Sequence, residues 1–210
     1  MVKAVSTQVM RESDAWTIAN GTPSEELMAR AARAIFEEGT WEPPVAVVCG
    51  KGNNAGDGYA AALLLDDIGI WCELILLEEK FSEDGAYYFE QCMEKEIPCM
   101  LWEEGIDLSG YGTILDCLLG TGFSGEVKEP MASLIRAVNE SGAYVISADI
   151  NSGLNGDTGE GDLFVKSDLT VSIGTYKLGH FCGRAKEAMK KKVNRDIGIE
   201  IRGQYVMMEE

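Results

Sequence analysis

Short apolar runs alternate with longer amphipathic segments along most of the chain after residue 40. Runs this short and rich in Val, Ile and Leu are typical of strands that are buried on both faces of a sheet. The segments between them carry apolar residues at helical spacing. The predicted strands are 45–49, 71–77, 99–102, 113–119, 144–148 and 169–173, and the predicted helices are 57–68, 82–95 and 130–141. This alternation predicts a parallel sheet with helices on both faces.

The first 40 residues predict two helices and no strand. The first helix is expected from Ser6 or Thr7 to Ile18. The run Thr22-Pro23-Ser24-Glu25 predicts the start of the second, with an N-cap, a proline at the first helical position and a capping-box glutamate. After residue 193 two more apolar runs follow, around 197–199 and 205–207. We therefore expect one domain over residues 1–210, with a helical extension (1–40) before a doubly wound core (41–210).

The net charge of the chain limits the kinds of ligand that it can bind. Asp and Glu outnumber Lys and Arg by 35 to 18, which gives a formal net charge of -17. Such a chain repels phosphate backbones and anionic lipids at long range, so we expect no nucleic-acid and no membrane partner. An anionic small molecule would have to be held by local dipoles, a cation or a few lysines.

The six cysteines form no C-x-x-C pair, and Cys49 and Cys117 lie inside apolar runs. This pattern favours buried, reduced thiols. No apolar run approaches the length that a bilayer requires. We therefore expect a cytoplasmic protein.

A glycine-rich turn directly follows the first predicted strand, with the sequence Gly-Lys-Gly-Asn-Asn-Ala-Gly-Asp-Gly from Gly50 to Gly58. A strand, a glycine-rich turn and a helix present backbone N–H groups to an anion. The spacing matches neither the P-loop nor strict G-x-G-x-x-G. A plain connector that happens to be rich in glycine remains the alternative for this turn.

Two further strands end in an acid. Asp116 lies within the run 113–119 and precedes a second glycine-rich loop, and Asp149 follows the run 144–148. Because the carboxyl ends of parallel strands meet at one edge of the sheet, Asn54, Asp116 and Ser152 are expected to converge there. Oxygen ligands with a single full charge suit a hard, weakly charged cation, although these residues do not select the metal. A satisfied acid at a strand end is the alternative for Asp116.

Three motifs carry a family resemblance. They are Gly52-Asn53-Asn54-Ala55-Gly56-Asp57-Gly58, Asp116-Cys117-Leu118-Leu119-Gly120-Thr121-Gly122-Phe123-Ser124-Gly125 and Asp149-Ile150-Asn151-Ser152-Gly153-Leu154. In this order they resemble the motifs of the NAD(P)H-hydrate epimerase family, the YjeF N-terminal domain. The resemblance implies a three-layer α/β/α Rossmann-like sandwich with a mostly parallel sheet. Ala55 stands where the family usually has glycine, and Asn151 where it usually has proline.

The same resemblance implies an isomerase that interconverts the R and S epimers of C6-hydrated NADH and NADPH in nicotinamide-nucleotide repair. Asp149 is the implied acid–base residue, and Asn54, Asp116 and Ser152 are the implied ligands of one potassium ion per subunit. The family also implies a homodimer through the N-terminal helices and a separate NAD(P)H-hydrate dehydratase as functional partner. The implied substrate-binding residues are Asn53, Asn54, Ala55, Gly56, Asp57, Gly120, Thr121, Gly122, Phe123, Ser124, Gly125, Glu126 and Asp149.

Two rival hypotheses remain from the sequence. A nucleotide-binding or scaffold protein without turnover is kept open by Ala55 and Asn151. A redox enzyme that uses NAD(P)H would need strict G-x-G-x-x-G and a ribose-binding acid at the usual spacing, and the chain has neither. Among the remaining charged residues, Lys177 is interpreted as a phosphate ligand or a solvated side chain, and His180 as a surface or packing residue.

Overall fold

The computed structural model describes residues 1–209 and contains a seven-stranded sheet and a three-stranded sheet. In the larger sheet every neighbouring pair is parallel, in the order β4-β3-β2-β5-β6-β7-β9. This confirms the predicted α/β class. The elements are β1 (Val2–Val5), α1 (Thr7–Ala19), α2 (Ser24–Glu38), β2 (Val45–Cys49), α3 (Asn53–Asp67), β3 (Cys72–Leu76), α4 (Glu83–Glu94), β4 (Cys99–Leu101), β5 (Thr113–Cys117), α5 (Met131–Glu140), β6 (Tyr144–Ala148), β7 (Leu169–Ile173), β8 (Tyr176–Lys177), the 3-10 turn η1 (Leu178–His180), α6 (Ala185–Ala188), β9 (Lys192–Arg195) and β10 (Val206–Met208).

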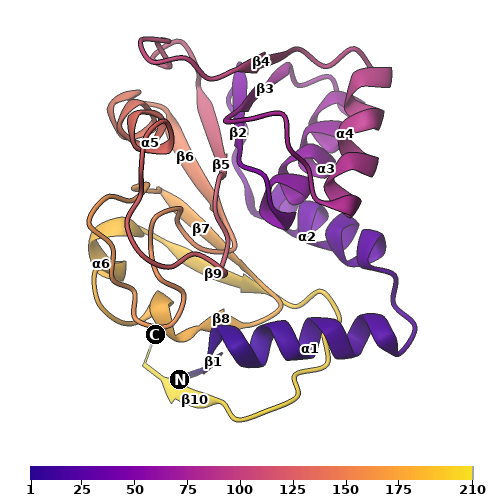
Figure 1. The fold of residues 1–210 in the computed structure, drawn as a ribbon, viewed down its shortest axis with the longest axis vertical. Helices are drawn as coiled ribbons and strands as arrows, with labels where there is room; N and C mark the ends of the chain where they lie inside the picture. The colour runs from indigo at the N-terminus through magenta and orange to yellow at the C-terminus, as the bar shows by residue number, and fades with distance from the viewer. Residues whose placement is uncertain (210) are drawn as a thin grey trace.

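Helices cover both faces of the large sheet, which gives the three layers of the predicted Rossmann-like sandwich (Figure 1). α2, α3 and α4 pack together on one face, and α5 covers the other. Side chains alternate along β2, so Val47 packs towards the α2–α4 face and Val48 towards the α5 face. Both sides of the strand are therefore buried, as its unbroken apolar sequence predicts.

The order of strands reverses between β2 and β5. From β2 the chain builds outward through β3 and β4, then returns to the other side of β2 and continues through β5, β6 and β7. In sheets of this kind the loops at the carboxyl ends separate at the reversal and leave a crevice for a ligand. The loops after β2 and β5 carry the two glycine-rich motifs.

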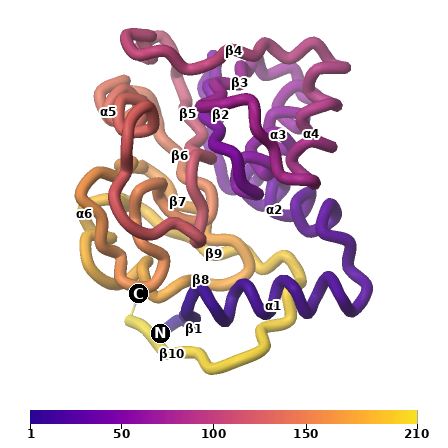
Figure 2. Tube along the Cα trace, in the orientation of Figure 1, coloured from indigo at the N-terminus to yellow at the C-terminus, as the bar shows by residue number. Residues whose placement is uncertain are grey.

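The smaller sheet joins the two ends of the chain. β1 pairs antiparallel with β10 and parallel with β8 (Figure 2). β1 is missing from the sequence prediction because a four-residue strand interrupted by Lys3 gives no periodic signal, and its partners lie far along the chain. The predicted helical extension therefore begins with a strand.

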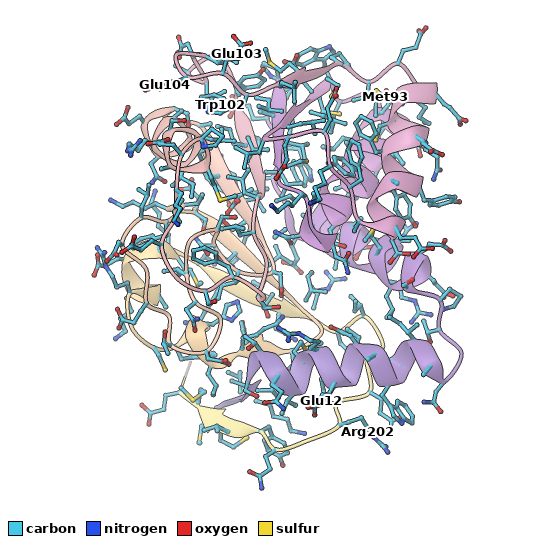
Figure 3. The ribbon with its side chains drawn as sticks, in the orientation of Figure 1. Glu12, Met93, Trp102, Glu103, Glu104 and Arg202 are labelled. Atoms are coloured by element: carbon cyan, nitrogen blue, oxygen red, sulfur yellow. The ribbon has the colours of Figure 1, made fainter. Side chains whose placement is uncertain are left out.

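α1 is held in place by hydrogen bonds at both ends. Asp157 accepts hydrogen bonds from the backbone N–H and the hydroxyl of Thr7, at 2.7 and 2.8 Å. On the other side the backbone N–H of Arg202 donates to Ser13 Oγ at 2.9 Å, and the Glu200 N–H donates to Thr17 at 3.1 Å. Glu12 of α1 and Arg202 of the C-terminal segment both lie on the side of α1 that is turned away from the large sheet (Figure 3).

Two local predictions differ from the structure. α3 begins at Asn53, four residues earlier than the predicted 57, because the glycines within the motif are helical. The capping box of α2 does not form: Pro23 itself is the N-cap residue, and no side chain caps the helix.

Cys49 and Cys117 are buried as predicted, whereas Cys99 is exposed on the edge strand β4. Over the described residues 1–209, none of the helices combines the length and apolar character needed to cross a membrane.

Candidate active site

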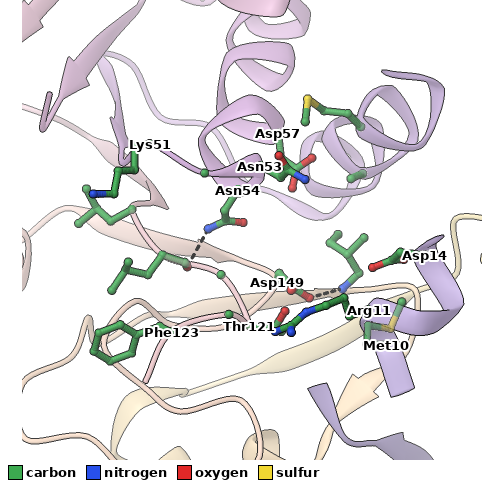
Figure 4. A pocket seen from close by; sticks show the side chains of 18 of the residues that line it. Met10, Arg11, Asp14, Lys51, Asn53, Asn54, Asp57, Thr121, Phe123 and Asp149 are labelled. Atoms are coloured by element: carbon green, nitrogen blue, oxygen red, sulfur yellow. Dashed lines mark hydrogen bonds between the residues drawn. The ribbon is translucent and has the colours of Figure 1, made fainter. Parts of the chain in front are cut away.

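A large cavity of about 870 Å³ opens at the carboxyl edge of the parallel sheet. The loops after β2, β5 and β6 line it on one side, and α1 and α2 line it on the other (Figure 4). Its volume lies in the range of sites that enclose a small ligand or cofactor. The cavity therefore occupies the crevice that the reversal of strand order predicts.

Asn54 connects the two glycine-rich loops at the point of reversal. Its Nδ2 donates a hydrogen bond to the Leu119 carbonyl oxygen at 2.9 Å. Its Oδ1 is buried and has no hydrogen-bond partner in the described part of the chain. Because a buried oxygen without a partner is costly, this atom is a candidate ligand for a cation.

Asp116 lies behind the cavity wall and is fully buried. Its carboxylate accepts hydrogen bonds from the backbone N–H and the hydroxyl of Ser152, from the Ser147 hydroxyl at 2.8 Å and from the Leu118 N–H at 3.3 Å. Desolvation raises the pKa of Asp116, and these hydrogen bonds act in the opposite direction. Asp116 thus ties the end of β5 to the end of β6, and Ser152 Oγ in turn accepts from the Leu119 N–H at 2.8 Å.

Asp149 faces the cavity from the residue after β6. Its backbone is left-handed, with φ of 64°, which is uncommon for a residue other than glycine and is found preferentially at functional sites. The Asp149 carboxylate forms an ion pair with Lys177 and accepts a hydrogen bond from the Ile173 N–H at 3.2 Å. Its side chain is 15% exposed, so one edge of the carboxylate remains open to a ligand.

Lys177 and His180 both support Asp149. A solvated Lys177 and a surface His180 are wrong, whereas a packing role for His180 agrees with its burial. Lys177 is buried, and its ammonium group also donates to the Ile173 carbonyl at 2.8 Å, so it is not solvated. His180 is fully buried: Nδ1 accepts from the Lys177 N–H, which leaves Nε2 as the donor to the Asp149 carbonyl at 2.8 Å. Burial, followed by the charge of Lys177, lowers the pKa of His180 to about 4, which keeps the ring neutral at physiological pH.

Two further carboxyls line the same end of the cavity, Asp57 from α3 and Asp14 from α1. Desolvation raises the pKa of Asp57 well above its ordinary value, and the nearby charges of Asp149 and Asp14 add to the effect. Desolvation also raises the pKa of Asp14 to about 6, against the opposing charge of Lys177. The three acids Asp14, Asp57 and Asp149 therefore share one ammonium group, and a proton within this group is favoured near neutral pH.

Most of the predicted binding residues line this cavity. Ala55, Gly56 and Gly125 do not line it, and Asp116 and Ser152 lie behind its wall. Gly56 instead allows α3 to approach α2, because a Cβ at this position would lie 2.4 Å from the Met28 sulfur. The predicted residues that line the cavity are Asn53, Asn54, Asp57, Gly120, Thr121, Gly122, Phe123, Ser124, Glu126 and Asp149.

The two departures from the family motifs have structural explanations. Ala55 is a buried residue of α3, where an alanine is a favourable helix former. Asn151 is fully buried; its amide donates to the carbonyl oxygens of Val165 and Ala188, and its oxygen accepts from Thr170 at 2.6 Å. Asn151 therefore joins β7 and α6 to the loop after β6, and neither residue disturbs the cavity.

Sequence reasoning missed the wall formed by the N-terminal helices. α1 contributes Met10, Arg11 and Asp14, and α2 contributes Leu27 and Met28. In the sequence, Asp14 is a polar residue among the apolar positions of the first predicted helix. The sequence does not tell which face of this helix meets the edge of the sheet, so Asp14 could not be assigned to a site.

A doubly wound α/β domain with glycine-rich loops and an acidic cluster at its strand-order reversal is a nucleotide-binding class of fold. The model of the family described as YjeF-related protein N-terminus matches residues 24–179, and the chain belongs to this family. The chain is 33% identical to the NAD(P)H-hydrate epimerase of Lentilactobacillus buchneri, over 95% of this chain and 96% of that protein.

A longer relative is also similar in sequence, and a solved structure has the same fold. The chain is 36% identical to the bifunctional NAD(P)H-hydrate repair enzyme Nnr of Coxiella burnetii, over 84% of this chain and 37% of that protein. It therefore spans little more than a third of that bifunctional relative. The crystal structure of yeast ynu0 shares the fold, with a TM-score of 0.75 at 20% identity, over 98% of this chain and 99% of that one.

Proposed function

We propose that the protein is an NAD(P)H-hydrate epimerase, an isomerase that interconverts the R and S forms of C6-hydrated NADH and NADPH. The observation that carries the proposal is Asp149, an ion-paired and partly open carboxylate that follows β6 and lines the cavity of a chain from this family. Nothing in the structure favours the alternative of an inactive scaffold, because Ala55 and Asn151 are both accommodated without loss of the cavity.

The substrate's chemistry explains why acid–base groups can carry out the reaction. The C6 hydroxyl is on the carbon next to the ring nitrogen, so once a general acid has protonated it, its loss as water gives an iminium ion and breaks no C–H bond. Asp149 is suited to accept the proton of the water that returns to the opposite face. Lys177 and the Ile173 N–H hold the Asp149 carboxylate in one orientation for this transfer.

The glycine-rich loops are suited to the diphosphate of the nucleotide. α3 begins at Asn53, so its free backbone N–H groups face the cavity beside Lys51 and Gly52. A Cβ at Gly122 would meet nothing within 4 Å, which leaves room for a ligand against the main chain of the second loop. These short-range groups are needed because the net charge of -17 opposes an anionic ligand.

We also propose that a potassium ion binds where Asn54, Asp116 and Ser152 meet. The unpartnered Asn54 Oδ1 supports this site, because it is a buried oxygen of a residue that is linked through Leu119 and Ser152 to the buried Asp116 carboxylate. The donor set contains only oxygens and one full charge, which suits a hard monovalent cation. When bound, the ion would supply positive charge that offsets part of the negative charge of an anionic ligand.

The remaining proposals rest on the family. A homodimer through the N-terminal helices, a cytoplasmic location and functional coupling to a separate dehydratase are expected for this chain. The bifunctional names of the longer relatives support the coupling, since those proteins are named as repair enzymes for the same hydrate.

The decisive experiment combines the purified protein with the pure R epimer and follows the S epimer by chromatography. In ¹⁸O-labelled water, loss and return of water predicts one labelled oxygen in the product, and in D₂O it predicts no deuterium at C6. A reaction without protein sets the spontaneous rate. Absence of acceleration over this rate would contradict the proposal.

A further inference from the structure

We propose that Asp14 is a second acid–base group of this cavity, placed on the wall opposite the strand ends, so that Asp14 and Asp149 divide the proton transfers of epimerisation between them. The inference rests on the proposed function and assigns a role to the N-terminal helix, which none of the glycine-rich motifs includes.

Asp14 is held on a fixed wall of the cavity. It lies in the middle of α1, whose first turn is bound to Asp157 and whose opposite side is bound by the C-terminal segment through Ser13 and Thr17. In Figure 4 the Asp14 carboxyl points from α1 towards Asp149, the ion-pair partner of Lys177, with Asp57 above them. The side chain is half-buried and makes no hydrogen bond with other described residues, so its oxygens are available to a ligand.

Three charged groups interact with Asp14 across the cavity: Lys177 on β8, Asp149 after β6 and Asp57 on α3. Arg11 on α1 itself and Asp84 on α4 line the same cavity. α2 and the C-terminal segment line this part of the cavity with uncharged side chains only, which are Ser24, Leu27, Met28, Ala31, Ile197 and Ile199. Desolvation by this largely apolar wall raises the pKa of Asp14 to about 6, more than the charge of Lys177 lowers it. A carboxyl that titrates near 6 can both give and take a proton at physiological pH.

With these two groups, every proton and every bond of the reaction is accounted for. Protonated Asp14 gives its proton to the C6 hydroxyl, the C6–O bond breaks, and water leaves with the iminium ion behind. A water molecule then forms a new C6–O bond on the opposite face and gives a proton to the Asp149 carboxylate. The reverse direction uses the same two groups with their roles exchanged, and the open cavity lets solvent return the proton.

Both directions therefore require the same singly protonated pair, and the rate should fall as the pH rises through about 6. Asp14→Asn should lower kcat by roughly 10²-fold with KM changed by less than about threefold, and it should remove this limb of the pH profile. Asp14→Glu, which keeps a carboxyl, should recover part of the rate and the limb. Glu12→Gln is the matched control, since Glu12 lies on the outer face of the same helix.

The outcomes separate the inference from the proposed function. A wild-type protein without turnover overturns both. An active wild type whose rate shows no fall near pH 6 overturns the role of Asp14 even if the Asp14→Asn variant does not fold. Unchanged kcat and pH profile in folded Asp14→Asn, or a change in KM alone, also overturns it.

Discussion

Asp116 and Asp149 occupy nearly equivalent positions in the sequence, yet the structure treats them differently. Each comes at the carboxyl end of an apolar strand and precedes a loop of small residues, and β5 and β6 are neighbours. Asp116 is fully buried, and its carboxylate is stabilised by hydrogen bonds from hydroxyl and backbone N–H groups, with no ion pair among the described residues. Asp149 is partly open and faces a buried ammonium group.

The difference shows that the role of a carboxylate depends more on its hydrogen-bond and ion-pair partners than on its position along a strand. Four dipolar donors occupy both oxygens of Asp116 and bind the loops to one another. Asp149 can exchange a proton with a ligand, because its carboxylate and that of Asp14 line the same cavity. Asp116 is therefore a scaffold and candidate cation ligand, and Asp149 is the candidate for chemistry.

The largest effect that tests this comparison is on turnover. Asp149→Asn should reduce epimerisation by roughly 10²–10⁴-fold, because the amide cannot take the proton of the incoming water. The variant should also unfold at a lower temperature, since Lys177 would lose its charged partner. Asp168→Asn is a suitable control, because Asp168 accepts a hydrogen bond from the Val145 N–H at the far end of the sheet. Near-normal turnover of Asp149→Asn would remove Asp149 from the mechanism.

The next effect is on stability. Asp116→Asn places an amide donor among groups that already donate, so it should lower the free energy of unfolding by about 2–4 kcal/mol. If potassium raises the unfolding temperature of the wild-type protein more than sodium does, the Asp116→Asn variant should lose this difference. Ser147→Ala removes only one of the donors and should cost about 1 kcal/mol with the potassium effect retained. If Asp116→Asn keeps the potassium effect, the cation site is elsewhere.

Acid titration of two groups near Asp149 should affect stability in opposite directions. His180 has a pKa lowered to about 4, so the stability it contributes is present above pH 6.5 and is lost as the pH falls towards 4. Asp14 has a pKa raised from 3.8 to about 6, so its contribution is present below 3.8 and is lost as the pH rises through 6.

Relative to wild type, Asp14→Asn should therefore gain about 1–2 kcal/mol at pH 7 and nothing near pH 4. His180→Gln should show its deficit at pH 7 shrink as the pH approaches 4. Chemical denaturation at several pH values measures both differences. If the difference in unfolding free energy from wild type did not change with pH for either variant, the pKa shifts assigned to Asp14 and His180 would be contradicted.

The smallest effect concerns the loops. Gly122→Val adds bulk inside the cavity, where a Cβ meets no protein atom, and should weaken nucleotide binding by about three- to fivefold without unfolding the chain. Gly110→Val is matched, because a Cβ there also meets open space but lies outside the cavity. Affinity should stay flat or rise modestly as salt increases to physiological strength, since screening relieves the net charge. A steep loss with salt would indicate a basic patch instead.

The parallel sheet could be predicted from the sequence because each buried strand carries its own apolar run between helices. Val45–Cys49 and Tyr144–Ala148 were predicted with their observed bounds. Asn54, Asp116 and Ser152 were expected to converge because parallel strands end at one edge, and the structure brings them together through Leu119 and Ser152 hydrogen bonds.

The parts that could not be predicted depend on contacts distant in sequence. The burial of Lys177 is invisible locally, because its partner Asp149 lies 28 residues earlier. Asp14 is one of several polar residues on a helix whose inward face is set by the C-terminal segment. The early start of α3 was missed because a glycine-rich motif has low helix propensity by itself, and tertiary packing overrides it.

The hydrogen bonds between α1 and residues 200–202 have a consequence for protein synthesis. The wall that carries Asp14 is synthesised well before the segment that fixes it, because the partners of Thr17 and Ser13 lie 183 and 189 residues later in the chain. Most of the parallel sheet and its helices can assemble during this interval, but α1 cannot be fixed against them until residues 200–202 have been made. A nascent chain can therefore carry a nearly complete sandwich while one wall of its cavity is still not held in place.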